Sequence, residues 1–239
     1  MSATRRIGAV ALTALFVTAF AGFIALGSWQ LQRRAWKLDL VERVDQRVHA
    51  PAVAAPLPER WRSMNRDADE YRRVRLAGTY LHDRETLVQA VTELGGGYWV
   101  MTPLQTPEGN IVLVNRGFVA PDRRDRSKRS GIEPSGVVTV TGLVRFSEPA
   151  GGLLGSLRRN DPTAERWYRR DVAAITSARR LPDNSAPWFL DADAIAGTEP
   201  VGGLTVISFS NNHLVYALTW FALALMAGAA AWRVWRTRR

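Results

Sequence analysis

The stretch IGAVALTALFVTAFAGFIALGSWQLQ at residues 7–32 decides the class of fold, because it contains no formally charged side chain. A second run, PVGGLTVISFSNNHLVYALTWFALALMAGAAAW at residues 200–232, is also uncharged and is interrupted only by the titratable His213. A helix of about 20 apolar residues crosses the roughly 30 Å hydrocarbon core of a bilayer. We therefore predict two transmembrane helices, at residues 7–29 and 208–232, on either side of a central region at residues 33–199.

The first run also has features of a cleaved signal peptide. A basic start that includes Arg5 precedes it, and the small residues Ala25 and Gly27 have the spacing of a cleavage site. Its apolar part, residues 7–26, is however longer than the roughly 7–15 residues of such a peptide. Trp29 follows among arginines, as in the aromatic and charged belt at a membrane interface. These features favour a retained helix.

The flanking charges predict the orientation. Four arginines lie in residues 233–239, and no basic residue lies between Pro200 and Trp232. By the positive-inside rule the C-terminal end is cytoplasmic, and with two crossings so are residues 1–6. The central region is then periplasmic, in a protein of a bacterial inner membrane. The six arginines in the two terminal segments account for most of the formal net charge of +10. The charge is therefore no argument for nucleic-acid binding.

The composition excludes several kinds of function. The chain has 239 residues and no cysteine, which excludes disulfides, thiolate metal sites, a CxxC redox pair and CxxCH haem attachment. The sequence has no P-loop, GxGxxG or GxSxG motif. The two histidines of the central region, His49 and His82, have no metal-ligand spacing, and we expect a surface role for His82 in a turn. No catalytic set is recognisable, so we predict that the protein is not an enzyme.

The central region reads as a mostly antiparallel β domain with minor helix, in the form of a small barrel. An amphipathic helix is expected to continue out of the first membrane segment over residues 36–50 and to end at Pro51. We expect turns at Gly95–Gly97 and Thr106–Asn110, a solvated basic loop at Arg123–Arg129, and a helix at Tyr168–Ser177. Strands are expected where Val, Leu, Thr or aromatic residues are bounded by turn formers, at Tyr71–Tyr80, Glu85–Val91, Tyr98–Gln105, Ile111–Val119, Val137–Phe146 and Trp188–Leu190.

His213 is the most unusual residue of the chain, because an ionisable group in or beside a membrane helix is costly and often functional. At helical spacing it shares a face with Tyr216, Ala217 and Trp220. Two aromatic rings, one small residue and one imidazole would suit a planar macrocycle with an axial ligand. The simpler interpretation is an interfacial histidine hydrogen-bonded to a neighbour, with Tyr216 and Trp220 in the aromatic belt.

The first helix carries small residues at four-residue intervals, Ala14, Thr18 and Gly22. Such a face lets two membrane helices approach closely. The second helix offers small residues as well, and we expect these two sets to form the helix contact. The residues expected on the second helix are Ala217, Ala224 and Gly228.

Ordered motifs at both ends of the chain make it similar to one family. The sequence resembles the surfeit locus protein 1 family of cytochrome oxidase biogenesis factors over about residues 26–232. The motifs that carry the resemblance are LGSWQLQRRAWK at 26–37, GGYWVMTPL at 96–104, VNRGFV at 114–119, VTGLVRFSE at 140–148 and NNHLVYALTWF at 211–221. Two departures are Ser210, where members often carry a base, and the GGLLGSLRR stretch at 151–159.

The resemblance implies a role in assembling haem–copper cytochrome oxidase. It implies that haem a is bound through His213, with the oxidase catalytic subunit and haem a synthase as partners in the membrane. With Ser210 in place of a base, we expect the haem propionates to meet Arg33 or Arg34, and the ring to lie between the two helices beside Tyr216, Ala217 and Trp220. A cofactor-free scaffold that stabilises an oxidase assembly intermediate is the alternative.

Overall fold

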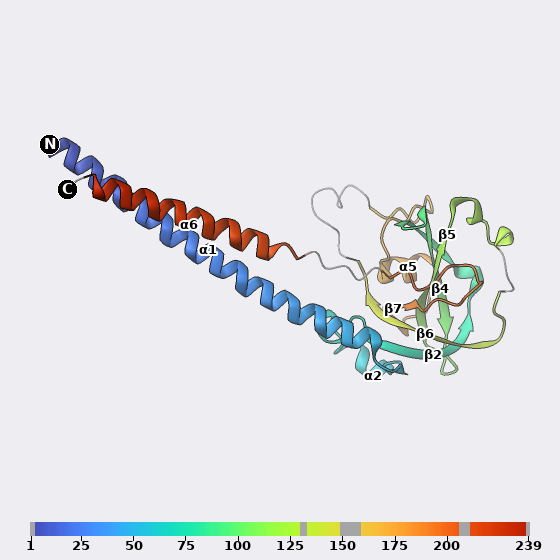
Figure 1. The fold of residues 1–239 in the computed structure, drawn as a ribbon. Coiled ribbons are helices and arrows are strands. Elements are labelled where there is room, and N and C mark those ends of the chain that lie inside the picture. Colours follow the sequence, from blue (N-terminus) through green and yellow to red (C-terminus); the bar gives the residue numbers. More distant parts are fainter. Residues whose placement is uncertain (1–2, 130–132, 149–158, 206–210, 238–239) are drawn as a thin grey trace. The chain divides into compact units, whose positions relative to one another are not determined.

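The computed structural model describes residues 3–129, 133–148, 159–205 and 211–237, and the chain divides into two compact units (Figure 1). The helical unit consists of Met1–Val44 and Ile207–Arg239, and the β unit of Asp45–Val206. Two long apolar helices therefore flank a β-rich domain in the sequence, as predicted. The β unit begins 12 residues later than the predicted central region because the first helix is longer than expected.

Helix α1 runs without a break over Ala3–His49, and α6 covers His213–Arg236. Both are long and apolar enough to cross a membrane. At 1.5 Å per residue, the 47 residues of α1 span about 70 Å, more than twice the hydrocarbon thickness. The predicted membrane helix at residues 7–29 and the predicted amphipathic helix at residues 36–50 are thus one rod. It ends just before Pro51, whose ring and missing N–H cannot continue a helix.

The two helices of the helical unit lie side by side and antiparallel (Figure 1). Gly27 faces the ring of Phe221, and Phe20 lies beside Gly228. As the residue number rises in α1 it therefore falls in α6. The first residues of α1 and the last of α6 consequently lie at the same end of the pair, as the predicted topology requires.

The β unit is a small barrel. Strand neighbours follow the order β1-β2-β6-β7-β5-β4-β3, and an extra pairing of β2 with β4 closes a circuit of five strands, β2-β6-β7-β5-β4. Five of the strand pairs are antiparallel, whereas β1–β2 and β5–β7 are parallel. This confirms the predicted mostly antiparallel barrel. The strands are β1 (Val53–Ala54), β2 (Arg73–Tyr80), β3 (Thr86–Thr92), β4 (Gly95–Gln105), β5 (Ile111–Val119), β6 (Val137–Phe146) and β7 (Ser185–Ala192).

Alternation along the strands produces two apolar cores, since successive side chains of a strand point to opposite faces. Inside the barrel, Val112 and Trp188 belong to one buried cluster. Their neighbours Leu113 and Phe189 point outward into a second cluster under α5 (Val172–Ala178), where Trp167 is 1% exposed. β5 is buried along nearly its whole length. Two-sided burial agrees with the mainly apolar sequence of β5, which was predicted with its observed bounds.

Two of the predicted elements are placed differently in the structure. The glycines at Gly95–Gly97 are the start of β4, and the turn is formed by Glu93 and Leu94. A Cβ at Gly97 would lie 2.3 Å from the carbonyl oxygen of Val119, so glycine serves here for close approach of two strands. Helix α5 starts later than predicted because the side chain of Asp171 caps it by accepting a hydrogen bond from the backbone N–H of Ala174.

A predicted loop, a predicted turn and several short helices make up the remaining parts of the β unit. The predicted solvated loop at residues 123–129 is wrong for Arg129, whose side chain is 6% exposed and bonds both oxygens of Glu85 at 2.8 Å. The predicted turn at Thr106–Asn110 is confirmed by a hydrogen bond from Gly109 to Thr106. The short helices are α2 (Pro58–Trp61), α3 (Arg66–Asp69), and the 3-10 turns η1 (His82–Arg84), η2 (Pro121–Arg123) and η3 (Arg126–Lys128).

Closure of the barrel depends on glycine at position 78. A Cβ added to Gly78 would lie 2.4 Å from the carbonyl oxygen of Gln105, at the point where β2 meets β4. We expect Gly78→Ala to lower the free energy of unfolding by about 2 kcal/mol or more, because backbone must move to relieve the overlap. Denaturant unfolding of the detergent-solubilised full chain, followed by tryptophan fluorescence, measures this.

Gly96→Ala is the matched control. Nothing lies within 4 Å of a Cβ at Gly96, so this variant should unfold within about 0.5 kcal/mol of the parent. Equal destabilisation by the two substitutions would show that the close approach of β2 and β4 is not what requires glycine.

Candidate functional site

The contact between α1 and α6 follows a repeat of alternating three- and four-residue steps. On α6 the buried or half-buried positions include His213, Ala217, Trp220, Ala224, Ala227 and Ala231. On α1 they include Phe16, Phe23, Gly27, Gln30 and Arg34, and the ring of Phe20 adds a contact with Gly228. This repeat is the pattern by which two helices stay in contact along their length.

The predicted packing face of α1 is wrong. Ala14, Thr18 and Gly22 are exposed, and nothing lies within 4 Å of a Cβ built at Gly22. Residues spaced by four advance by about 400° around the helix axis, which is about 40° more than a full turn. Such a repeat drifts away from a contact face that repeats every 3.5 residues. The close approach occurs instead at Gly27, where a Cβ would lie 2.5 Å from the ring of Phe221. On α6 the predicted residues Ala217, Ala224 and Gly228 do face α1.

His213 begins α6 and is hydrogen-bonded across the helix pair. Its Nδ1 lies 2.7 Å from Oε1 of Gln30. An amide oxygen only accepts hydrogen bonds, so Nδ1 carries the proton and Nε2 carries the lone pair of the neutral ring. Among the residues that the structure describes, Nε2 has no hydrogen-bond partner. The arrangement therefore presents one oriented imidazole nitrogen that is free to bind a ligand.

The other predicted site residues on α6 have different surroundings. Trp220 stacks on Phe23 of α1 at 5.7 Å between ring centroids, and Ala217 is fully buried between the helices. Tyr216 is 55% exposed and lies outside the helix contact. The expected grouping of His213 with Tyr216, Ala217 and Trp220 on one open face is thus not what the structure shows, because Ala217 and Trp220 are already occupied by α1.

The arginines predicted to meet the propionates differ in position. The guanidinium of Arg33 lies 4.0 Å from the centroid of the Trp36 ring, on its own helix. Arg34 is half-buried and follows Gln30 by one helical turn, about 6 Å along the axis. Arg34 therefore shares the face that carries Gln30. Ser210 and residues 151–158 of the unusual glycine-rich stretch lie outside the described residues.

Two unshared polar atoms thus lie at the start of α6. Besides His213 Nε2, Oδ1 of Asn211 is buried and has no hydrogen-bond partner within the described part of the chain. Asn212 occupies the N-cap position, but its side chain makes no capping hydrogen bond. A buried unpaired acceptor is uncommon in folded proteins and calls for a donor.

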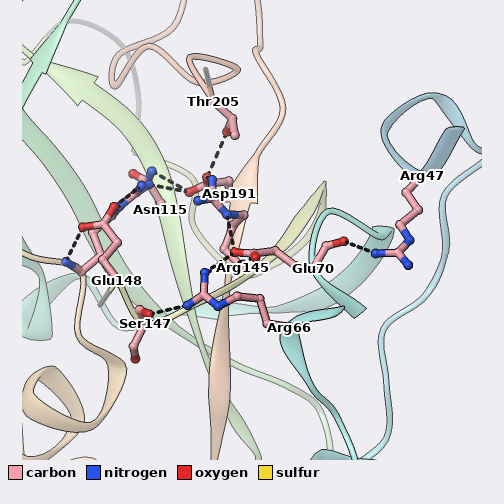
Figure 2. Close-up of polar contacts among 10 residues, drawn as sticks. Arg47, Arg66, Glu70, Asn115, Arg145, Ser147, Glu148, Asp191 and Thr205 are labelled. Atoms are coloured by element: carbon pink, nitrogen blue, oxygen red, sulfur yellow. Dashed lines mark hydrogen bonds and ion pairs between the residues drawn. The ribbon is translucent and has the colours of Figure 1, made fainter. Parts of the chain in front are cut away.

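The β unit holds a second polar centre, a buried ionic network around Asp191 on β7 (Figure 2). The Asp191 side chain is 2% exposed. Its Oδ1 accepts from Asn115 at 2.8 Å and from Arg170 at 3.0 Å. Its Oδ2 accepts from Arg145 at 3.1 Å and from Thr205 at 2.9 Å. All the strong acceptor positions of the carboxylate are therefore used.

The network continues outward through two further carboxylates. Glu148 binds Arg170 at 2.5 Å, and Glu70 binds Arg145 at 3.3 Å and Arg66 at 3.0 Å. Three carboxylates thus meet three guanidinium groups. Burial lowers the pKa of Arg145, but the charges of Asp191, Tyr71 and Glu70 more than offset this and leave its pKa raised. Figure 2 shows that the cluster also reaches Thr205 and, through the Glu70 carbonyl, Arg47.

The sequence analysis missed this network. Asp191 stands near Asp193 among acids of ordinary frequency, and its partners lie between 14 and 76 residues away. The only local signal is an aspartate at the end of the apolar run Trp188–Leu190, where a buried strand continues into a charged residue. Every described member is paired, so the network is structural: it joins β5, β6 and β7 to the segments that carry Arg66 and Arg170.

The two other histidines have partners of their own. His49 Nδ1 lies 3.0 Å from the carbonyl oxygen of Asp45 in the same helix, and its side chain is 74% exposed. His82 is not a surface residue as predicted: its side chain is 17% exposed, and Nε2 lies 3.0 Å from the carbonyl oxygen of Pro134. Within the described residues, no three His, Asp or Glu side chains are grouped so as to hold a metal ion.

The fold and the site define a membrane protein in which an antiparallel helix pair flanks a small β barrel in the sequence, with one imidazole nitrogen that has no partner among the described residues. The chain belongs to the SURF1 family, whose model matches residues 17–225. It is 34% identical to surfeit locus protein 1 of Rattus norvegicus and 33% identical to that of Homo sapiens. These alignments cover 87% of this chain and 70% and 71% of the relatives. A SURF1-like protein of Caenorhabditis elegans is 30% identical over 92% of this chain and 71% of its own length.

The helix contact gives a prediction about Gly27. We expect Gly27→Val to displace Phe221 and weaken the pairing of α1 with α6, because no space exists for a larger side chain. The chain has no cysteine, so Phe20→Cys with Gly228→Cys supplies a clean pair for a short bismaleimide. The yield of the intramolecular cross-link in membranes should fall at least twofold. Gly22→Val should leave it unchanged, and a loss with Gly22→Val as large as with Gly27→Val would contradict the observed packing face.

The ionic network gives a prediction about Asp191. Asp191→Ala leaves Arg145 and Arg170 buried with one counter-charge removed, and breaking such a buried pair costs about 3–5 kcal/mol. Chemical unfolding of the solubilised chain should show this loss. Asp193→Ala removes a single half-exposed pair with Arg73 and should cost about 1 kcal/mol or less. If both variants unfold alike, the network does not organise the β unit.

Proposed function

We propose that this protein is an assembly factor for haem–copper cytochrome oxidase that binds haem a through Nε2 of His213 and helps deliver it to the catalytic subunit. The observation that carries the proposal is the hydrogen bond from His213 Nδ1 to Gln30 Oε1. Histidines that bind metals usually donate their other ring N–H to an oxygen, which fixes the tautomer and the ring orientation. Membership of the SURF1 family supports the same role, and a non-catalytic one.

The donor set of the helical unit fits a haem better than a free metal ion. A zinc or copper ion needs three or four protein ligands, and no such group exists among the described residues. A haem iron already has four ring nitrogens and needs one axial imidazole. When bound, the group supplies an iron centre whose chemistry is used in the oxidase. The buried, unpaired Oδ1 of Asn211 offers an acceptor for a hydroxyl group, which haem a carries and haem b lacks.

The packing of α1 against α6 favours a position for the ring at the start of α6. Further along, Trp220 is stacked on Phe23 and Ala217 is buried, so a ring between the helices at this level would have to separate them. At the start of α6 the next group on the Gln30 face is Arg34. A guanidinium binds a carboxylate in a two-pronged geometry, so Arg34 is the better placed of the two predicted partners for a propionate, and Arg33 the second.

The proposed role of His213 suits a carrier as well as a binding site. The hydrogen bond to Gln30 occupies Nδ1, so Nε2 is the nitrogen that a neutral ring would offer to iron. His213 would hold the group through one ring nitrogen, and an acceptor protein with its own histidine could take the group over. The antiparallel helix pair and the terminal arginines support cytoplasmic ends and a periplasmic β unit in the inner membrane.

The proposal predicts the haem content of two variants. In cells that make haem a, His213→Ala should lower the haem a bound per purified chain at least tenfold, because the axial ligand is gone. Gln30→Leu should weaken binding by about tenfold, the usual effect of removing the group that orients a metal ligand. The Soret absorption and the pyridine haemochrome of the detergent-solubilised protein measure both.

His49→Ala is the matched histidine control, since His49 bonds only within its own helix, and it should retain the full haem content. Tyr216→Leu should also retain it, because Tyr216 is 55% exposed and lies outside the helix contact. If His213→Ala carries as much haem a as the parent at equal abundance, the cofactor-free scaffold is the function instead.

A further inference from the structure

The open end of the barrel contains a pocket of about 420 Å³ that none of the roles above uses. Its apolar lining includes Val138, Val140 and Ala192, which also pack against the core inside the barrel, together with Ile195 and Pro200. The pocket belongs entirely to the β unit. Barrel mouths of this size, largely apolar with a few polar groups, are a common location for small-molecule binding.

Arg116 of β5 is the cation of this pocket. Its guanidinium lies 5.1 Å from the centroid of the Tyr80 ring, and Nη1 is 3.4 Å from Nδ1 of His82. Within the described ranges, no carboxylate lies within 4.0 Å of it. Burial lowers the pKa of Arg116, which reflects the unfavourable removal of its charge from water. A half-buried guanidinium normally has an anionic partner.

The acids around Arg116 are already paired with other arginines. Asp193 in the lining binds Arg73 at 2.5 Å, and Glu199 in the lining lies 3.9 Å from Arg123. Two further acids whose charges reach Arg116 are paired as well. They are Glu85, which binds Arg129 at 2.8 Å, and Glu133, which binds Arg126 at 3.2 Å. Arg116 is therefore the charge in this pocket that the described chain leaves without a counter-charge.

The two aromatic neighbours of Arg116 are set up to assist an anion. Nε2 of His82 lies 3.0 Å from the carbonyl oxygen of Pro134, to which it can only donate, and Nδ1 faces Arg116 at 3.4 Å and Glu133 at 3.8 Å. Burial raises the pKa of Tyr80 to about 12, so its phenol stays protonated and can donate a hydrogen bond. Neither group competes with Arg116 by bringing a negative charge.

We propose that this pocket binds a small organic monocarboxylate, with its carboxylate on Arg116 and its compact apolar body against Val138, Val140 and Ile195. One guanidinium neutralises one carboxylate in a two-pronged geometry. A doubly charged phosphate would be left with excess charge and too few donors. The apolar walls require a branched or aromatic body. This inference is independent of haem binding, because every residue that it uses lies in the β unit.

The test uses 4-fluorophenylacetate and its neutral analogue 4-fluorophenylacetamide, which share the same body. Line broadening in 19F NMR, with the detergent-solubilised full chain and a protein-free micelle blank, gives the dissociation constants. We expect saturable binding of the carboxylate by one site and at least tenfold weaker binding of the amide. Absence of saturable binding, or equal affinity for both compounds, overturns the proposal.

The variants locate the site. Arg116→Met should weaken carboxylate binding at least tenfold, whereas Arg75→Met, which removes an exposed arginine of β2 outside the pocket, should leave it unchanged. Ile195→Ala keeps the test decisive if Arg116→Met does not fold, since Ile195 is 70% exposed and its truncation leaves the barrel intact. It should weaken binding two- to fivefold. Unchanged affinity in either pocket variant overturns the proposal.

Discussion

The carboxylate of Asp191 is the group on which the β unit depends, because it brings three neighbouring strands and two connecting segments to one buried point. β5 contributes Asn115, β6 contributes Arg145, and the segment before α5 contributes Arg170. A buried carboxylate is tolerated only when paired and fully hydrogen-bonded. A one-residue slip of β6 against β7 would move Arg145 to the other face and leave Asp191 without that partner. The apolar core can be packed in several ways, but this network is satisfied in one register.

In the helical unit, too, a polar group needs a hydrogen-bonding partner, but the surroundings there are those of a membrane helix. An imidazole at the edge of a membrane helix requires a polar partner, and Gln30 on the opposite helix supplies it. That bond satisfies Nδ1 alone. The residue that holds His213 in place thereby also decides which nitrogen remains reactive, so the packing of α1 against α6 and the chemistry of His213 depend on each other. Gly27, one turn before Gln30 on the same face, permits the close approach that the bond needs.

Strands rich in apolar and β-branched residues could be predicted from the sequence alone. β5 and β6 have the expected bounds because most of their residues are of these types. The two long helices could be predicted from the absence of charged residues. The contact face of α1 could not, because Ala14, Thr18 and Gly22 suggested a four-residue repeat. The true contact combines large and small residues, with Phe23 beside Gly27, and these have no common chemical type that a search for small residues would find.

The partners that complete a polar site were the hardest to predict. His213 was recognisable because a lone histidine in an uncharged run is conspicuous, yet its partner Gln30 is 183 residues away and is an ordinary amide in sequence. Asp191 was not recognisable at all, since aspartates are common. Sequence spacing predicts contacts within one helix or strand. It does not predict which residue of a distant element closes a hydrogen bond, because this depends on how the barrel and the helix pair are closed.

The degree of pairing distinguishes the three polar centres of this protein. Asp191 has four partners among the described residues, so it has no capacity left for a ligand, and its role is to hold the barrel. His213 has one partner for two ring nitrogens. Arg116 has a histidine nitrogen and an aromatic ring, but no counter-charge within the described chain. A buried polar group contributes to stability only when its hydrogen bonds are made. A buried group that lacks a hydrogen-bond partner or a counter-charge therefore lowers the stability of the fold unless a ligand supplies it. This criterion is the physical basis for proposing binding sites at the helix pair and the barrel mouth, and for assigning the Asp191 network a structural role.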